Sequence, residues 1–173
     1  ISGKIMYEDK EIGSNGFTGN TMLKAVRYAV VDVVNVVSSS VLYTTQTNSL
    51  GVYSISTLTG STAVYVRVNS IATPPTSASI TVADLASAKY GVPSENISLS
   101  GSANVNITIN TVNIAGGAFN ILDVMATGYD FIHHLSGAYP SVPLAVFWEP
   151  GNTLYGTYFC TGGCLPNGDG IYV

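Results

Sequence analysis

Charged residues are scarce in this sequence. Asp, Glu, Lys and Arg make up only 9% of its 173 residues, against about 25% in an average soluble domain. With six Lys and Arg residues and a formal net charge of −4, the chain cannot form a basic patch that neutralises many phosphates, so we expect no nucleic-acid partner. Ser, Thr, Asn, Gly and Tyr must cover the surface instead, which is typical of extracellular β-rich proteins and of subunits that pack against copies of themselves.

Long apolar runs and catalytic motifs are also missing. Asp32 and Asn35 interrupt the longest apolar run, which therefore stays below the ~20 residues of a membrane-spanning helix. The sequence contains no zinc-binding H-E-x-x-H, no phosphate-binding Walker loop and no G-x-S-x-G nucleophile motif. We expect no membrane span, no cofactor and no enzymatic activity.

Few residues are candidates for a metal site. His133 and His134 are the only histidines, and adjacent residues of a helix point about 100° apart, which favours a structural role at a helix C-terminus. The run Asn167–Gly170 has too few carboxylates for a calcium loop and is interpreted as a surface turn. Asp32 lies in a valine-rich run, where a buried carboxylate needs hydrogen-bond partners. We predict a structural carboxylate there and no metal site.

Several features favour secretion. The chain begins at Ile1 without Met or a charged leader, which we interpret as a processed N-terminus, although a trimmed chain would look the same. Cys160 and Cys164 are the only cysteines and enclose Thr-Gly-Gly; a local disulfide is the first prediction, with a metal pair or free thiols left open. Asn96 and Asn106 each begin an N-x-[ST] triplet and are candidate glycosylation sites.

The stretch Leu23–Val37 is the most apolar part of the chain. Ten of its fifteen residues are Val, Ala or Leu, and seven of these are Val, a β-branched residue that suits a packed sheet. We predict one buried strand covered on both faces. The neighbouring predictions are an opening strand at 1–12, a turn-rich loop at Gly13–Asn20, a hairpin formed by Val41–Thr47 and Gly51–Thr57, and a half-buried alternating strand at Thr62–Ile71.

The order GKIMYEDKEI, RYAVVDVVN, SVLYTTQTNSLGVYSIST and AVYVRV resembles the carboxypeptidase-regulatory-like, transthyretin-like β-sandwich of secreted bacterial and archaeal proteins. The turn T-N-S-L-G-V-Y-S-I, Thr47–Ile55, carries most of the resemblance, because the family commonly has T-D-x-x-G-x-Y/F there. The resemblance covers residues 1–72 and implies a module without catalytic residues.

The rest of the chain contains one clear helix. Gly116–Leu135 repeats apolar residues at helical spacing and predicts a mostly buried helix, with Asn120 and Asp123 near its positive end. Further predictions are a strand at Asn104–Ile114 and a strand at Pro143–Gly151. The overall prediction is a mainly β protein: an N-terminal Ig/transthyretin-like antiparallel β-sandwich at 1–72, a linker with additional strands at 73–115, and a smaller α+β region with one long buried helix at 116–173.

A second resemblance concerns residues 116–173. The order GGAFNILDVMATGYDFI, PLAVFWEPG, GTYFC and GIYV resembles the segment that leads into the zinc-binding helix of secreted metallopeptidase-like proteins. The H-E-x-x-H helix itself is absent from the sequence, so the resemblance implies no peptidase activity for this chain.

These observations favour a non-enzymatic extracellular structural protein. We predict a self-assembling subunit of a filament or surface layer that shares strands with copies of itself, through its N-terminal or C-terminal strand. Removal of residues 1–12 should then abolish assembly and leave the fold intact. Two alternatives stay open: the non-catalytic front half of a secreted zinc metallopeptidase-like protein, and a glycan or cell-wall binding module.

Overall fold

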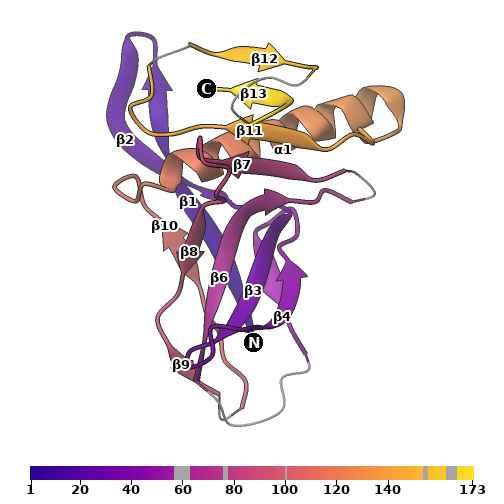
Figure 1. Ribbon diagram of the computed structural model, residues 1–173. Coiled ribbons are helices and arrows are strands. Elements are labelled where there is room, and N and C mark those ends of the chain that lie inside the picture. The colour runs from indigo at the N-terminus through magenta and orange to yellow at the C-terminus, as the bar shows by residue number, and fades with distance from the viewer. Residues whose placement is uncertain (57–62, 76–77, 100, 154–155, 163–166) are drawn as a thin grey trace.

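Strands dominate the structure, as the sequence predicts. The computed structural model describes residues 1–56, 63–75, 78–99, 101–153, 156–162 and 167–173. They form two open sheets and one helix (Figure 1). The elements are β1 Ser2–Gly13, β2 Gly16–Ala25, β3 Ala29–Asn35, β4 Val41–Gln46, β5 Val52–Ser54, β6 Ala63–Ala72, β7 Ile80–Ala83, β8 Gly91–Pro93, β9 Ile97–Ser98, β10 Ile107–Ile109, α1 Gly116–Ser136, β11 Leu144–Phe147, β12 Tyr158–Cys160 and β13 Gly170–Tyr172.

The first sheet is built around β1. Its strand order is β10-β1-β2, and β5 also pairs with β1. The hairpin of β1 and β2 runs antiparallel from the pair Met6 and Ala25 to the pair Gly13 and Gly16, whereas β10 lies parallel to β1. The opening strand predicted at 1–12 is therefore confirmed, and it is a central strand of its sheet.

The second sheet has the order β12-β13-β11-β7-β6-β3-β4, with β8 and β9 also on β6. β6 shows the predicted alternation: Val64, Val66 and Val68 are fully buried, and the residues between them are half-buried. One core cluster joins buried residues of both sheets and of α1, so the sheets and the helix share a hydrophobic core.

The prediction of one buried strand at Leu23–Val37 is wrong. Leu23 belongs to the exposed strand β2, and the chain then leaves the first sheet and enters the second as β3. Tyr28, with a φ of 58°, makes this break. Apart from Val26, which lies just before it, the buried valines of this segment lie in β3. Val37 lies beyond the strand and is 90% exposed.

Two other local predictions are also wrong. The segment Gly13–Asn20 is not a loop, because only Ser14 and Asn15 form the turn and β2 starts at Gly16, whose φ of 108° suits this turn. The strand β5 pairs with β1, not with β4. The Asn48 side chain accepts hydrogen bonds from the backbone N–H groups of Leu50 and Val52, and this turn carries the chain from one sheet to the other.

The helix α1 is confirmed, but its burial is uneven. Phe119, Leu122, Ala126 and Tyr129 are buried as the periodicity predicts. Leu135, which the same pattern placed in the core, is 69% exposed, because the last turns of α1 extend beyond the sheet (Figure 1). The strands predicted at Asn104–Ile114 and Pro143–Gly151 are real but shorter, as β10 and β11.

Candidate assembly site

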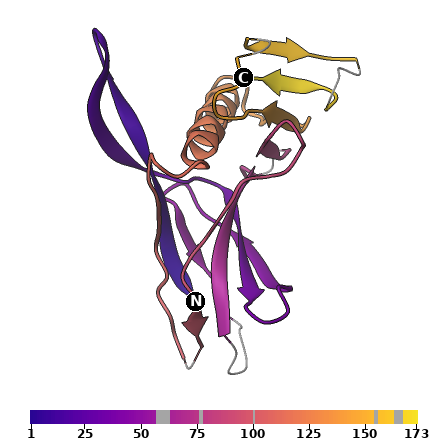
Figure 2. The same ribbon diagram turned by 60° about the vertical axis from the view of Figure 1, so that its left-hand side comes forward.

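The outer part of the β1–β2 hairpin projects from the body of the protein (Figure 2). We call this part, Lys10–Leu23, the arm. Its apolar side chains are open to solvent: Ile12 is 73% exposed and Phe17 70%, and Met22 and Leu23 are about half exposed. Exposed apolar residues that gather on one element mark an interaction surface more often than single ones do.

The strand β2 also has a free edge. It lies at the end of its sheet, and among the described residues it pairs with β1 alone. Natural edge strands usually carry charges or proline that prevent further pairing. β2 contains no proline and only one charge, Lys24, and the Lys24 ammonium lies 2.6 Å from a carboxylate oxygen of Asp9. The backbone groups on the outer side of β2 are therefore available to another strand.

A cleft of about 690 Å³ lies between the arm and the N-terminal half of α1. Apolar side chains of the arm, of the loop before α1 and of the segment after β11 form most of its wall, together with a few polar groups. The lining residues are Glu8, Asp9, Lys10, Ile12, Phe17, Thr111, Val112, Asn113, Ile114, Gly116, Gly117, Asn120, Val124, Trp148 and Pro150.

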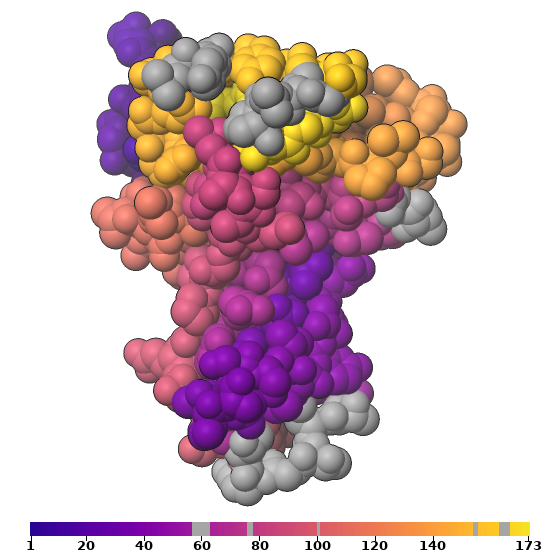
Figure 3. Space-filling model, in the orientation of Figure 1, coloured from indigo at the N-terminus to yellow at the C-terminus, as the bar shows by residue number. Residues whose placement is uncertain are grey.

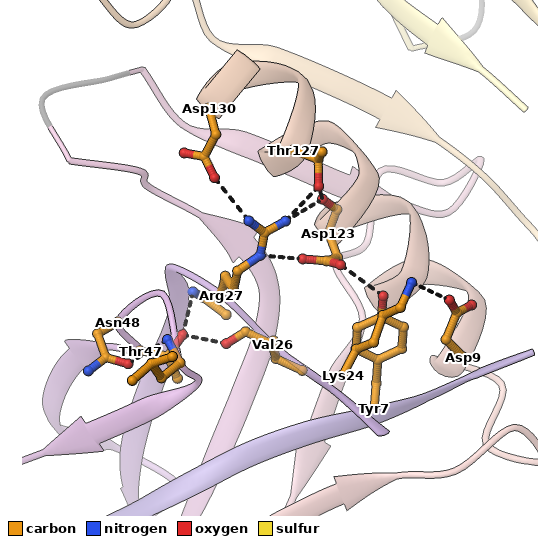
Figure 4. Close-up of polar contacts among 12 residues, drawn as sticks. Tyr7, Asp9, Lys24, Val26, Arg27, Thr47, Asn48, Asp123, Thr127 and Asp130 are labelled. Atoms are coloured by element: carbon orange, nitrogen blue, oxygen red, sulfur yellow. Dashed lines mark hydrogen bonds and ion pairs between the residues drawn. The ribbon is translucent and has the colours of Figure 1, made fainter. Parts of the chain in front are cut away.

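The guanidinium of Arg27 fixes α1 against the sheets (Figure 4). Its Nε donates to Asp123 Oδ1 at 2.6 Å and its Nη1 donates to Asp130 Oδ2 at 2.9 Å. Its Nη2 donates to Thr127 Oγ1 at 2.6 Å and to the Asp123 carbonyl at 3.1 Å. Arg27 is thus held by two turns of the helix, and only 20% of its side chain is exposed.

The base of the arm is tied to the same helix. The Tyr7 hydroxyl donates to Asp123 Oδ2 at 2.9 Å, and burial together with the negative charge of Asp123 raises the pKa of this phenol far above its usual value. Asp9 accepts a 2.6 Å hydrogen bond from the Asn120 amide. These contacts hold the arm at a fixed angle to α1, so the cleft is a preformed feature of the fold.

Arg27 is not among the site residues that the sequence predicts. Its ion-pair partners lie 96 and 103 positions further along the chain, and no local pattern reports such a contact. One signal was present, because a lone Arg interrupts the valine-rich run. Asp123 was assigned to the helix N-terminus, whereas it contacts Arg27 from the second turn of α1.

Asp32 is a structural carboxylate, as predicted. It is 7% exposed and accepts hydrogen bonds from Thr44 at 2.8 Å, Arg67 at 2.9 Å and Asn69 at 2.8 Å. Burial alone would raise the pKa of Asp32, but these donors outweigh it and hold the pKa below its usual value. All three donors lie on β4 and β6, the two neighbours of β3, so their hydrogen bonds to Asp32 link three adjacent strands of the second sheet.

The remaining candidates lie apart from the arm. The His133 ring stacks on Tyr139 with centroids 4.1 Å apart, at the exposed end of α1. Asn96 and Asn106 are exposed and therefore accessible to glycosylation, which stays a prediction for both. Cys160 ends β12, but Cys164 lies outside the described residues, so the disulfide also stays a prediction.

The predicted turn Asn167–Gly170 packs on the loop after β7. Within it, the Asn167 amide donates to the Leu85 carbonyl at 2.8 Å, and the Tyr172 hydroxyl donates to the Gly168 carbonyl at 2.9 Å. Among the described residues, no group of three or more His, Cys, Asp or Glu side chains is placed to hold a metal ion. In the same residues, no helix is long and apolar enough to cross a membrane.

Comparison of the chain with protein-family models, with curated proteins and with solved structures found no match in any of the three. The resemblances to the carboxypeptidase-regulatory-like sandwich and to the metallopeptidase segment therefore stay predictions.

Proposed function

We propose that this chain is a non-enzymatic extracellular structural subunit that assembles with copies of itself through the free edge of β2. The observation that carries the proposal is the arm: a projecting hairpin whose outer edge is unpaired and whose apolar side chains are exposed. Strand addition at such an edge gives backbone hydrogen bonds between subunits, and the side chains beside it add apolar contact.

The pairing partner that fits this edge best is β2 of a second copy. Thr21–Ala25 is paired with Met6–Lys10 of β1 without interruption, so its outer edge is regular. Two such edges can pair antiparallel around a twofold axis, which makes the contact isologous. Met22 and Leu23 of both copies would become buried in this contact, and the single Lys24 of each copy is already neutralised by Asp9.

We do not propose β1 as the shared strand, because both of its edges are already paired within the subunit. β1 pairs with β10, β2 and β5, and its residues Ile5 and Tyr7 are fully buried. Removal of residues 1–12 should therefore unfold the first sheet. We expect this outcome in place of the earlier prediction that the deletion leaves the fold intact.

The proposal is tested by placing a charge on the edge of β2. Leu23→Lys puts like charges close together across the twofold axis, so it should prevent assembly and leave the circular dichroism spectrum and melting temperature almost unchanged. Val37→Lys is the matched control, because Val37 is 90% exposed and lies outside the arm. Light scattering after size exclusion, over a range of concentrations, gives the readout. A Leu23→Lys chain that assembles like its parent would contradict the proposal.

A further inference from the structure

The sequence contains two Asn-Gly pairs, Asn15-Gly16 and Asn167-Gly168. Asparagine is a thermolabile residue, because its side-chain amide can be attacked by the backbone nitrogen of the next residue. Glycine in that next position has no side chain to hinder the attack. The structure places the two pairs in very different surroundings.

Asn15 lies at the tip of the arm. Ser14 and Asn15 form the turn between β1 and β2, and every residue from Ile12 to Asn20 is exposed. Figure 3 shows the tip in indigo at the upper left, where it stands out from the body of the molecule. Within the described part of the chain, no residue forms a hydrogen bond with the Asn15 side chain.

The tip can open without disturbing the core. Its nearest side-chain hydrogen bonds run from Thr18 and Asn20 to the Glu11 carboxylate, at 2.8 and 3.1 Å, and both are exposed. Closer to the turn, backbone pairing of the two strands closes the hairpin. Exposed ends of this kind open locally at a small fraction of the global free energy of unfolding. The Gly16 nitrogen can therefore reach the Asn15 side chain while the rest of the protein stays folded.

The Asn167-Gly168 pair is held by three hydrogen bonds. The Asn167 side-chain amide donates to the Leu85 carbonyl at 2.8 Å, and its backbone N–H donates to the Tyr172 hydroxyl at 3.3 Å. That hydroxyl donates in turn to the Gly168 carbonyl at 2.9 Å, and Tyr172 is only 4% exposed. Ring closure moves the side chain and the backbone of Asn167 together, so these hydrogen bonds must break first.

We propose that Asn15 is a site of spontaneous deamidation in the folded protein and that Asn167 is protected. The Gly16 backbone nitrogen gives up its proton to water and forms a bond to Cγ of Asn15, while the bond from Cγ to the side-chain nitrogen breaks and ammonia leaves. Water then opens the cyclic imide at either carbonyl, which yields aspartate or isoaspartate. The reaction consumes water, releases ammonia and needs no oxidant or reductant.

Both products change the tip of the arm. The run from Ile12 to Leu23 contains no charged residue, so the new carboxylate is the only charge in it. Isoaspartate also adds a carbon to the main chain within the turn, and the pairing of Gly13 with Gly16 that closes this turn leaves no room for a longer chain. We therefore expect the tip to lose its pairing in the isoaspartate form and to keep it in the aspartate form.

The site lies apart from the proposed contact between copies. That contact uses the regular segment Thr21–Ala25, which is separated from the turn by the hydrogen bonds of Thr18 and Asn20 to Glu11. Deamidation and self-assembly are therefore independent, and failure of one leaves the other standing.

Peptide mapping by mass spectrometry tests the proposal on the full chain, incubated for weeks at neutral pH. In the folded protein, Asn15 should deamidate at least about tenfold faster than Asn167, since two or three net hydrogen bonds protect only the second pair. In concentrated urea, where neither turn persists, the two rates should become similar. Asn15→Gln is the control, because its longer side chain closes a ring far more slowly. Equal rates in the folded protein, or a faster rate at Asn167, would overturn the proposal.

Hydrogen exchange separates the effects of the two products. Asn15→Asp has the new charge with an unaltered main chain, so backbone amides of residues 12–18 should exchange as in the parent. The isoaspartate form, isolated from aged protein by anion exchange, should exchange the same amides at least about tenfold faster, because the tip is open more of the time. Equal exchange in the isoaspartate form and in Asn15→Asp would overturn the effect assigned to the longer main chain.

Discussion

Arg27 is the residue whose loss should disturb the arrangement of arm and helix most. Arg27→Leu removes the ion pairs with Asp123 and Asp130 and the hydrogen bond to Thr127, and leaves the carboxylate of Asp123, 13% exposed, with Tyr7 as its remaining side-chain partner. Removing one partner of a buried ion pair lowers the free energy of unfolding by roughly 3–5 kcal/mol. Because Arg27 is 20% and Asp130 31% exposed, solvent screens part of this loss, and we expect a decrease of about 2–3 kcal/mol in the free energy of unfolding.

Urea denaturation followed by fluorescence and circular dichroism measures this change. The expected loss corresponds to a melting temperature about 5–10 °C lower for a protein of this size. Relative to the parent chain, hydrogen exchange in the variant should speed up more for the backbone amides of α1 than for those of β6. Lys24→Gln is the control: the Lys24 side chain is 43% exposed, so its loss should cost less than about 1 kcal/mol. An Arg27→Leu variant within about 0.5 kcal/mol of its parent would refute the role given to Arg27.

Three further predictions concern the core. Burial raises the pKa of Tyr53 to about 12, so the neutral phenol stabilises the fold below pH 10, and on the order of 2–3 kcal/mol of stability should disappear as the pH rises from 10 to 12. The pKa of Asp32 is lowered in the fold, so its carboxylate stabilises the fold above the unfolded pKa, and this stability is lost as the pH falls through the folded pKa. Asp32→Asn should therefore lower the free energy of unfolding by about 1–3 kcal/mol at neutral pH. The same variant should lose less stability than its parent as the pH falls. Gly51→Ala should cost about 2–3 kcal/mol, because φ is 75° and the added Cβ would lie 2.5 Å from the Ile5 carbonyl oxygen.

Each of these predictions has a measurement and a control. Urea titrations at pH 9, 10, 11 and 12 check Tyr53, and Tyr53→Phe should reduce the alkaline loss; an unchanged loss would contradict the assignment. Titrations between pH 2 and 7 check Asp32, where a variant with the slope of its parent would contradict the reasoning. Gly128→Ala is the matched glycine control, since its Cβ would meet open space and should stabilise the helix by up to about 1 kcal/mol; Gly51→Ala fails as a prediction if it behaves the same way.

The parts of the fold that depend on local periodicity could be predicted from the sequence. The alternation of Val64, Val66 and Val68 identified β6, and the apolar spacing of residues 116–135 identified α1, because a strand and a helix bury one face at a period set by their own geometry. The need of Asp32 for partners followed from the cost of burying a bare carboxylate. Both the periodicity and the cost of a buried charge depend only on residues that are close together in the chain.

The parts that depend on distant contacts could not be predicted. Tyr28 adopts a positive φ because the chain must change sheets there. Val26 before it and the valines after it make the segment look continuous in the sequence. β5 pairs with β1 across about fifty residues, where proximity in the chain favoured β4. The sequence predicts a loop at Gly13–Asn20, in the outer part of the arm, since Gly and Asn there indicate turns, whereas tertiary pairing with β1 extends β2 through most of these residues. The cleft and the Arg27 contacts exist only after these pairings form.

Sedimentation velocity of the parent chain over a hundredfold range of concentration tests the central claim most directly. A dimer of the 18.0 kDa chain should form as the concentration rises, and Leu23→Lys should prevent its formation. A single 18.0 kDa species at every concentration would contradict self-assembly through the arm.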